Sequence, residues 1–398
     1  MVRTKRAVRT RRLMVLALAA GAATAALAST PAQAVTGASW RADLSTVDND
    51  DANVRFADGA LKLADPAEHH PGADGYLLLA AHTTGTPVNR VSATISAKGT
   101  GVEVDVRGQI GPDDWTEWLP TGPNAAVLPK TVTTVQVRVG LSDGAEVDSV
   151  SLQADQAPQL GAAAVTSPLT YRVYATREGL VGATTANGHK IVTNDHFVAL
   201  PSAKPLAPRN TGNYTVRVCK TDNSRCEYAP VWDVGPWNIK DDYWNPAATR
   251  SMWKDLPQGK PEAQAAYLDN YNGGKDDSGR KVANPAGIDL ADGVFNLGLD
   301  LSDNGYVNVS YLWTGSGPAG TVGTAGDPLN VRAGASTSAA VKGLAANHAK
   351  VIIECYSLGD TVTGTYGTSN IWDRIGTGNY VSDTYLQTGS DLPVAPVC

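Results

Sequence analysis

Short runs of alternating apolar and polar residues constrain the fold of this chain more than any other feature. Three of them are Gly101–Arg107, Val135–Val139 and Val150–Ala154. A period of two places one face of a β-strand against a core and the other face toward solvent. The 40 Gly and 23 Pro residues of the chain favour turns between such runs. We therefore expect a mostly β protein, with a β-sandwich domain over residues 36–156.

The N-terminus has the three parts of an export signal. Basic residues between positions 3 and 12 precede an apolar, Ala-rich stretch at 13–27, and residues 31–34 end in a small-x-small cleavage pattern. The apolar stretch is shorter than the roughly 20 residues that a membrane-spanning helix needs. We expect residues 1–34 to be removed and the mature protein to be secreted, without a membrane partner. Sec and twin-arginine export both remain open.

Charge and aromatic content narrow the range of partners. The formal net charge of −6 argues against nucleic acid, which is bound by basic faces. The 9 Trp and 14 Tyr residues far outnumber the 3 Phe residues. Aromatic rings with polar atoms suit stacking on sugars, although surface β proteins show the same bias.

All four cysteines, Cys219, Cys226, Cys355 and Cys398, follow the signal. An even number of cysteines in an exported protein predicts disulfides. Cys219 and Cys226 flank a turn-rich segment, so their pairing is geometrically easy, and it leaves Cys355 to pair with Cys398. A zinc site is the alternative, but neither a CxxC motif nor clustered histidines accompany these cysteines.

Two segments of linker composition divide the mature chain into three blocks. Residues 157–169 carry little structure-forming signal, and residues 315–326 begin with Gly-Ser-Gly-Pro-Ala-Gly. They separate the first block from a middle block at 170–314 and from a last block at 327–398, which again indicates short strands. One helix is expected in the middle block, where Pro261 suits a first turn and good helix formers follow it.

Four segments of the middle block occur in an order that is typical of double-psi β-barrels. They are Thr185–Gly188 (TANG), His196 before Ala199–Pro201 (ALP), Trp232–Trp237 (WDVGPW) and Gly287–Ala291 (GIDLA). The set resembles the rare-lipoprotein-A family of wall lytic transglycosylases and, more distantly, the expansins. The resemblance covers a little over a third of the chain. It implies a six-stranded double-psi β-barrel with a partly helical insertion.

The last block resembles a bacterial SH3-type domain. Leu329–Ser336 is similar to the opening of that family, and Ile371–Ile375 with Tyr380–Asp383 is similar to its end. The resemblance implies an SH3-like barrel that targets a hydrolase to peptidoglycan. We therefore expect peptidoglycan or another cell-wall polysaccharide as the partner of a monomeric protein.

Carboxyl groups are the first candidates for chemistry, because glycosidic cleavage needs a proton donor to the leaving oxygen. Asp289, in an apolar strand context, matches the Asp shared by the expansins and the wall lytic enzymes; the alternative is an Asp that caps a short helix. Asp233 matches the family's Asp-x-Gly-Pro segment, where it would raise the pKa of Asp289 or bind the sugar, unless it only braces the turn that follows. Glu178 falls near a position that lines the family's groove.

Two histidines complete the candidate catalytic set. His196 matches a family histidine, although a lone histidine near a strand is more often structural. In the lytic enzymes a Glu commonly follows Thr-Ala-Asn-Gly, and His189 stands in that place here. This departure implies either that an imidazolium replaces the carboxyl or that cleavage has been lost.

The stretch from Trp237 to Pro285 is an insertion relative to these families. We expect Trp237, Tyr243 and Trp244 to wall the groove and stack on sugars; the alternative is an ordinary packed excursion. Its acidic pairs lack the ligand spacing of a calcium loop, so we expect no metal and no cofactor. Two functions remain open: a peptidoglycan lytic transglycosylase, and a non-catalytic, expansin-like or wall-binding protein.

Overall fold

The computed structural model describes residues 37–122, 124–157 and 167–398. The expected export signal and most of the first expected linker lie outside these residues. The described part is mostly β, as expected, and residues 36–398 belong to one compact unit. None of its helices is both long and apolar enough to cross a membrane.

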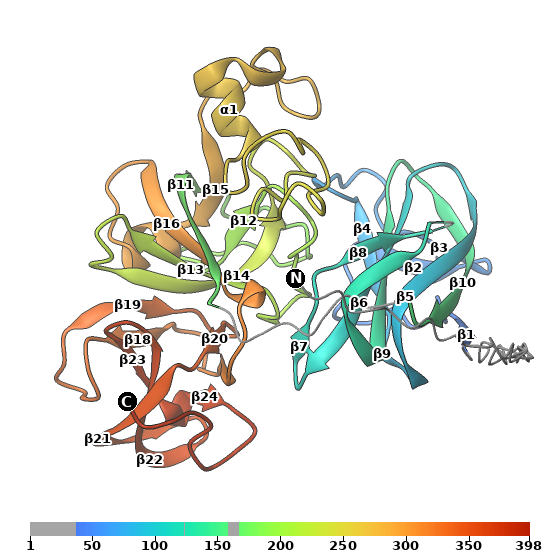
Figure 1. Cartoon of the computed structure of the whole chain (residues 1–398). Helices are drawn as coiled ribbons and strands as arrows, with labels where there is room; N and C mark the ends of the chain where they lie inside the picture. Colours follow the sequence, from blue (N-terminus) through green and yellow to red (C-terminus); the bar gives the residue numbers. More distant parts are fainter. Residues whose placement is uncertain (1–36, 123, 158–166) are drawn as a thin grey trace, which may run out of the picture. The chain divides into compact units, whose positions relative to one another are not determined.

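The first domain is a ten-stranded antiparallel sheet, coloured blue to green in Figure 1. Its strands form one hydrogen-bonded network, not the two separate sheets of the expected sandwich. The reason is that β5 and β9 are long, and register shifts along their pairing let them join different neighbours. The alternating apolar residues point into a core of this domain's own. The strands are β1 Ala38–Arg41, β2 Val54–Ala57, β3 Ala60–Leu63, β4 Gly75–Leu78, β5 His82–Lys98, β6 Val102–Gly111, β7 Asp114–Trp115, β8 Leu119–Thr121, β9 Ala126–Leu141 and β10 Glu146–Asp155.

The middle block is a closed six-stranded β-barrel. The strand order is β12-β15-β11-β16-β13-β14, and β14 pairs with β12 to close it. Two pairs are parallel, β11 with β15 and β12 with β14, and the other four are antiparallel. A barrel has no unpaired edge, so all six strands are held on both sides. The strands are β11 Leu169–Glu178, β12 Val198–Leu200, β13 Thr215–Lys220, β14 Cys226–Val234, β15 Ala286–Ala291 and β16 Gly305–Tyr311.

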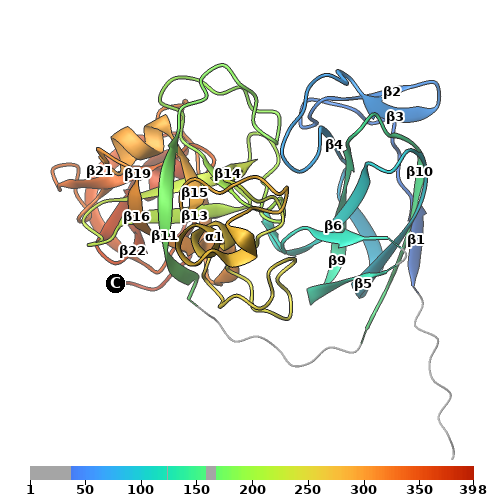
Figure 2. The ribbon, with the colours of Figure 1, turned by 90° about the horizontal axis from the view of Figure 1, so that it is seen from above.

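The segment between β14 and β15 contains the expected helix, α1 (Glu262–Asp269). Pro261 precedes it, and Asn270, in the left-handed conformation, ends it. Figure 2 shows α1 beside β15, and a Cβ added to Gly287 of β15 would lie 2.4 Å from the ring of Pro261. Three short helical segments follow α1 before the last block: η1 Tyr271–Gly273, η2 Gly293–Gly298 and η3 Leu312–Thr314.

The last block extends the barrel sheet and adds one separate sheet. Five of its strands extend the barrel sheet through a parallel pairing of β14 with β19, and β17, β20 and β24 form a separate three-stranded sheet. The expected second linker is therefore wrong in part, because β17 lies inside it and pairs with both β20 and β24. The elements are β17 Ala319–Val322, β18 Leu329–Arg332, β19 Val341–Ala345, β20 Lys350–Ile352, β21 Cys355–Gly364, β22 Gly367–Gly376, β23 Asn379–Ser382, η4 Asp383–Tyr385 and β24 Leu386–Gln387.

Both expected disulfides are present. Cys219 and Cys226 face each other across the β13–β14 hairpin, and Cys355 at the start of β21 pairs with Cys398. No cysteine of the described residues is free, so the zinc alternative is excluded for these side chains.

Candidate functional site

The pairing of the barrel strands brings two expected aspartates to the same level. Ala199 on β12 is the register partner of Asp233 on β14 and also of Asp289 on β15. Asp289 is in turn the partner of Thr176 on β11, and Glu178 lies two residues further along that strand. Paired residues point to the same face of a sheet, as do residues two apart on one strand. These residues therefore form one row across four adjacent strands, which we call the carboxyl row.

The row faces away from the barrel core. The neighbours of its members along the strands, such as Ala175, Val198 and Leu290, belong to the core cluster. Neighbouring strands lie about 4.8 Å apart, so the backbones of Asp233 and Asp289 are separated by roughly 10 Å. The small side chain of Ala199 stands between them.

Asp289 is the member of the expected pair to consider first as an acid. Its side chain is half-buried and accepts a hydrogen bond from the hydroxyl of Thr176. Burial raises the pKa of Asp289 to about 7, with the charge of Asp233 adding to the rise and the Thr176 bond opposing it. The helix-capping alternative is wrong, because Asp289 lies inside β15 and not at a helix start.

Glu178 and Asp233 form a carboxyl pair. Burial first, and then the charge of Asp233 and a hydrogen bond to it, raise the pKa of Glu178 to about 9. Glu178 therefore keeps its proton at neutral pH and donates it to Asp233. Asp233 also accepts the backbone N–H groups of Ala186 and Val234, each at 2.8 Å, although burial still raises its pKa. Glu178 is 8% exposed and lies at the end of β11.

His189 is held beside the row, not within it. Its Nε2 lies 2.6 Å from Oδ2 of Asp195, and its ring centre lies 4.7 Å from that of Trp232. The hydrogen bond from His189 is the main influence that outweighs burial and lowers the pKa of Asp195. The charge of Asp195 also contributes to the raised pKa of Glu178. His189 and Asp195 are thus a pair at the edge of the carboxyl row.

His196 is bound elsewhere. Its Nδ1 lies 2.6 Å from Oε1 of Glu227, a fully buried residue of β14. Burial lowers the pKa of His196, but the hydrogen bond to Glu227 and the nearby carboxylates outweigh this, so the pKa is raised. The interaction supports the structural alternative for this histidine.

The three expected sugar-stacking aromatics have different surroundings. Trp237 is half-buried, packs against α1 and donates from its indole nitrogen to Asn284 at 2.9 Å. Tyr243 and Trp244 are fully buried in the barrel core, so their assignment to sugar stacking is corrected. Both satisfy their polar atoms internally: Tyr243 donates to the carbonyl of Gly287 at 2.9 Å, and Trp244 donates to Glu117 at 2.7 Å.

Thr176 and Asp195 are functional candidates that the sequence did not reveal. Thr176 precedes Glu178 by two residues on the same strand, so strand periodicity alone was a signal for it. Asp195 becomes a neighbour of His189 only through the folded loop between β11 and β12.

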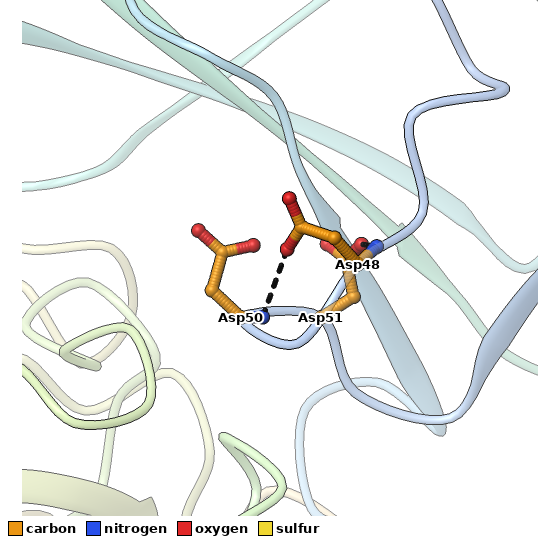
Figure 3. A group of neighbouring side chains, drawn as sticks. All are labelled: Asp48, Asp50 and Asp51. Carbon is orange, nitrogen blue, oxygen red and sulfur yellow. Dashed lines mark hydrogen bonds between the residues drawn. The ribbon is translucent and has the colours of Figure 1, made fainter.

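The first domain carries a second acidic group, drawn in Figure 3. Oxygens of Asp48, Asp50 and Asp51 lie within 4.8 Å of one another, the one group in the described residues with three such potential metal ligands. Burial, followed by the hydrogen bond and charge of Asp48, raises the pKa of Asp50 to about 7. Asp51 already accepts the backbone N–H groups of Asp48 and Leu78, at 2.7 and 2.6 Å. These bonds give the group a structural role in bracing its loop.

Comparison with known proteins gives two kinds of match. The model of a domain of unknown function (DUF8814) matches residues 169–310, which run from β11 into β16. Two proteins of Bacillus subtilis (strain 168), the uncharacterized proteins YraI and YraJ, are 45% and 47% identical to this chain over 87 residues. The matched part is 20% of this chain and 73% and 74% of the two Bacillus proteins. Through this shared region, the chain belongs to the family of YraI and YraJ.

Proposed function

We propose that this chain is a secreted protein that cleaves bacterial cell-wall glycan, with peptidoglycan as the first candidate substrate. The observation that carries the proposal is the carboxyl row, in which Glu178, Asp233 and Asp289 share one outward face of the barrel. All three pKa values are raised. Raised carboxyl pKa values in a partly exposed site are typical of general acids.

Asp289 is assigned the acid and base roles of a lytic transglycosylase. A pKa of about 7 lets it carry a proton at neutral pH and release that proton readily. Asp289 protonates the glycosidic oxygen as the C–O bond breaks, and the departing sugar leaves as an alcohol. The resulting carboxylate then takes the proton of the 6-hydroxyl, whose oxygen attacks the anomeric carbon and closes an anhydro ring. One carboxyl thus serves both half-reactions.

Glu178 and Asp233 are assigned to the electrostatics and binding of the site. The carboxylate of Asp233 disfavours a second charge on Asp289 and so keeps that residue protonated. The protonated Glu178 donates a hydrogen bond to Asp233 and so stabilises that carboxylate. Trp237, which follows Asp233 by four residues, supplies the half-buried aromatic face of the groove.

We also propose a double-psi topology for the barrel and an SH3-like fold for the last block. Two parallel pairs in a closed barrel of six strands support the double-psi topology that the sequence resemblance implies. The strands of the last block, five on the extended barrel sheet and three in a separate sheet, support an SH3-like barrel for wall targeting. A cleft in this block is lined by Asp327, Asn330, Thr337 and Tyr385, whose polar groups suit wall glycopeptide.

A non-catalytic, expansin-like function is the second candidate, and His189 is the observation that favours it. The side chain occupies the family's Glu position and is committed to Asp195 at 2.6 Å. In this alternative the carboxyl row binds sugar hydroxyls and breaks no bond.

Digestion of purified peptidoglycan, followed by mass analysis of the released muropeptides, separates the candidates. Anhydro-muramyl ends would support the lytic reaction, whereas new reducing ends would show that the glycan is hydrolysed instead. Binding to the insoluble wall without release of fragments would refute cleavage and leave the expansin-like function.

A further inference from the structure

The outward face of the barrel carries more than the carboxyl row. Strand β11 lies between β15 and β16 in the sheet (Figure 1). Val173 and Ala175 of β11 belong to the barrel core. Arg172, Tyr174 and Thr176 alternate with these two residues and so lie on the outward face. Because Thr176 is a member of the carboxyl row, the same face continues from the row along β11 to Arg172, over roughly 13 Å.

Two tyrosines form an aromatic pair on this part of the face. Tyr174 is the register partner of Tyr306 on β16, and their ring centres lie 5.3 Å apart with the ring planes at 89°. Both side chains are half-buried and lie outside the barrel core, in contrast to Tyr243 and Trp244. An aromatic ring with one exposed side and a polar tip is suited to stacking on a sugar ring.

Arg172 adds a positive charge beside the tyrosine pair. Its side chain is exposed, and its guanidinium lies 3.9 Å from the ring centre of Tyr306, which is a cation–π contact. No carboxylate of the described residues pairs with Arg172, whereas Arg177, the other arginine of β11, pairs with Asp292 at 3.3 Å. The planar fork of Arg172 is therefore available to bind a carboxylate of a ligand.

The charges on this face indicate which ligand it suits. The muramic acid of peptidoglycan has a lactyl arm that ends in a carboxylate or continues into a stem peptide with carboxylates of its own, whereas chitin and cellulose carry no charge. The carboxyl row repels an anionic arm, and Arg172 at the other end of the face attracts it. A muramic acid unit can thus place its ring on the tyrosine pair and its arm at Arg172.

We infer that Arg172, Tyr174 and Tyr306 form a subsite for a sugar that carries a carboxylate, which we call the Arg172 subsite. The subsite selects glycan that contains muramic acid over neutral glycan. This inference rests on the proposed function, because it extends the same outward face and names the kind of sugar that binds there.

The test is isothermal titration calorimetry of the full chain with three disaccharides. Two are N-acetylglucosamine–N-acetylmuramic acid with and without its stem peptide, in which no sugar follows the muramic acid and the proposed reaction has no bond to break. The third is neutral chitobiose. Arg172→Gln is expected to weaken binding of the acidic disaccharides about tenfold and to leave chitobiose binding unchanged. A loss confined to the peptide-bearing disaccharide would assign the carboxylate to the stem peptide, and a loss for both would assign it to the arm.

Arg90→Gln is the control for net charge, because Arg90 is 45% exposed on β5 of the first domain. It should bind all three disaccharides like wild type. Equal affinities of Arg172→Gln and wild type for the acidic disaccharides would overturn the inference. So would a wild type that binds chitobiose as tightly as the acidic disaccharides, or one that binds none of the three.

A second pair of variants tests stacking without changing a charge. Tyr306→Leu is expected to weaken binding of acidic and neutral disaccharides about 2–10-fold, because the ring is lost. Tyr306→Phe keeps the ring and should bind like wild type. Equal affinities of these two variants, both shown to be folded by circular dichroism, would contradict stacking on Tyr306.

The outcomes separate this inference from the proposed cleavage, because the measurement is of binding. Selective binding by a protein that releases no glycan fragments would leave the Arg172 subsite standing and refute cleavage. Unchanged binding by Arg172→Gln in a protein that cleaves would refute the subsite alone.

Discussion

Replacing Glu178 by glutamine is expected to stabilise the protein at neutral pH while it damages the site. The folded protein raises the pKa of Glu178 to about 9, from an ordinary value of 4.5. Between these values the folded state holds a proton that the unfolded state has lost, so stability falls as pH rises. The slope is about 1.4 kcal/mol per pH unit for one proton. Glutamine keeps the shape and the donor to Asp233 but does not titrate.

The magnitude follows from this slope. From pH 5 to pH 7 the wild type loses roughly 3 kcal/mol that Glu178→Gln retains. A side chain that costs stability where it sits is typical of a residue kept for function. The assay is urea unfolding at several pH values, followed by tryptophan fluorescence, with the free energy of unfolding compared at each pH.

Glu146→Gln is the control, since the pKa of this surface carboxyl is shifted in the opposite direction to that of Glu178. The hydrogen bond from Lys98 lowers the pKa of Glu146, so this carboxylate stabilises the fold above its ordinary pKa, and that contribution is lost as the pH falls. No gain at pH 7 is expected from its removal. Unfolding free energies of Glu178→Gln and wild type that fall in parallel would refute a protonated Glu178.

Three further predictions concern the rest of the fold and site. Asp233→Asn is expected to lower the pKa of Asp289 by removing a neighbouring charge. Because Asp289 must be protonated to act as the acid, the alkaline side of the pH–rate profile would then shift to lower pH, and an unchanged profile would show that Asp233 does not act on Asp289. Glu117→Leu leaves the indole N–H groups of Trp244 and Trp313, both now bonded to Glu117 at 2.7 Å, without an acceptor. Its expected cost is about 2–6 kcal/mol in urea unfolding, at about 1–3 kcal/mol for each of the two donors, and a loss below 1 kcal/mol would contradict the bonding. Non-reducing peptide mapping should find Cys219 linked to Cys226 and Cys355 linked to Cys398. A crossed pairing would contradict both disulfides.

Local sequence signals were sufficient where neighbours in the chain decide the structure. Alternation predicted β-structure, Pro261 and the residues after it predicted α1, and cysteine spacing predicted the short disulfide. Asp233 and Asp289 were found because each stands in a short motif. That they belong to one row was not visible, since the barrel register through Ala199 brings them together.

The two wrong sugar-stacking assignments share one physical cause: aromatic residues occur in cores and in sugar sites alike. Tyr243 and Trp244 were placed in the groove from aromatic density, but Trp244 stacks on Tyr311 with ring centres 5.1 Å apart. Glu117, which accepts the indole N–H of Trp244, lies in the first domain, 127 residues away in sequence. Contacts between domains, including that of Glu117 with Trp244, have no periodicity or motif that a single sequence displays.

The most direct test of the catalytic assignment is the cleavage rate of Asp289→Asn on purified peptidoglycan. We expect the cleavage rate to fall about 10²–10⁴-fold. Wall binding should stay nearly unchanged, because an amide still hydrogen-bonds sugars but cannot donate and recover the proton. Asp300→Asn is the control, since that side chain is 79% exposed and lies outside the row, and it should cleave like wild type. A folded Asp289→Asn protein that cleaves at the wild-type rate would contradict the assignment of Asp289 as the general acid and base.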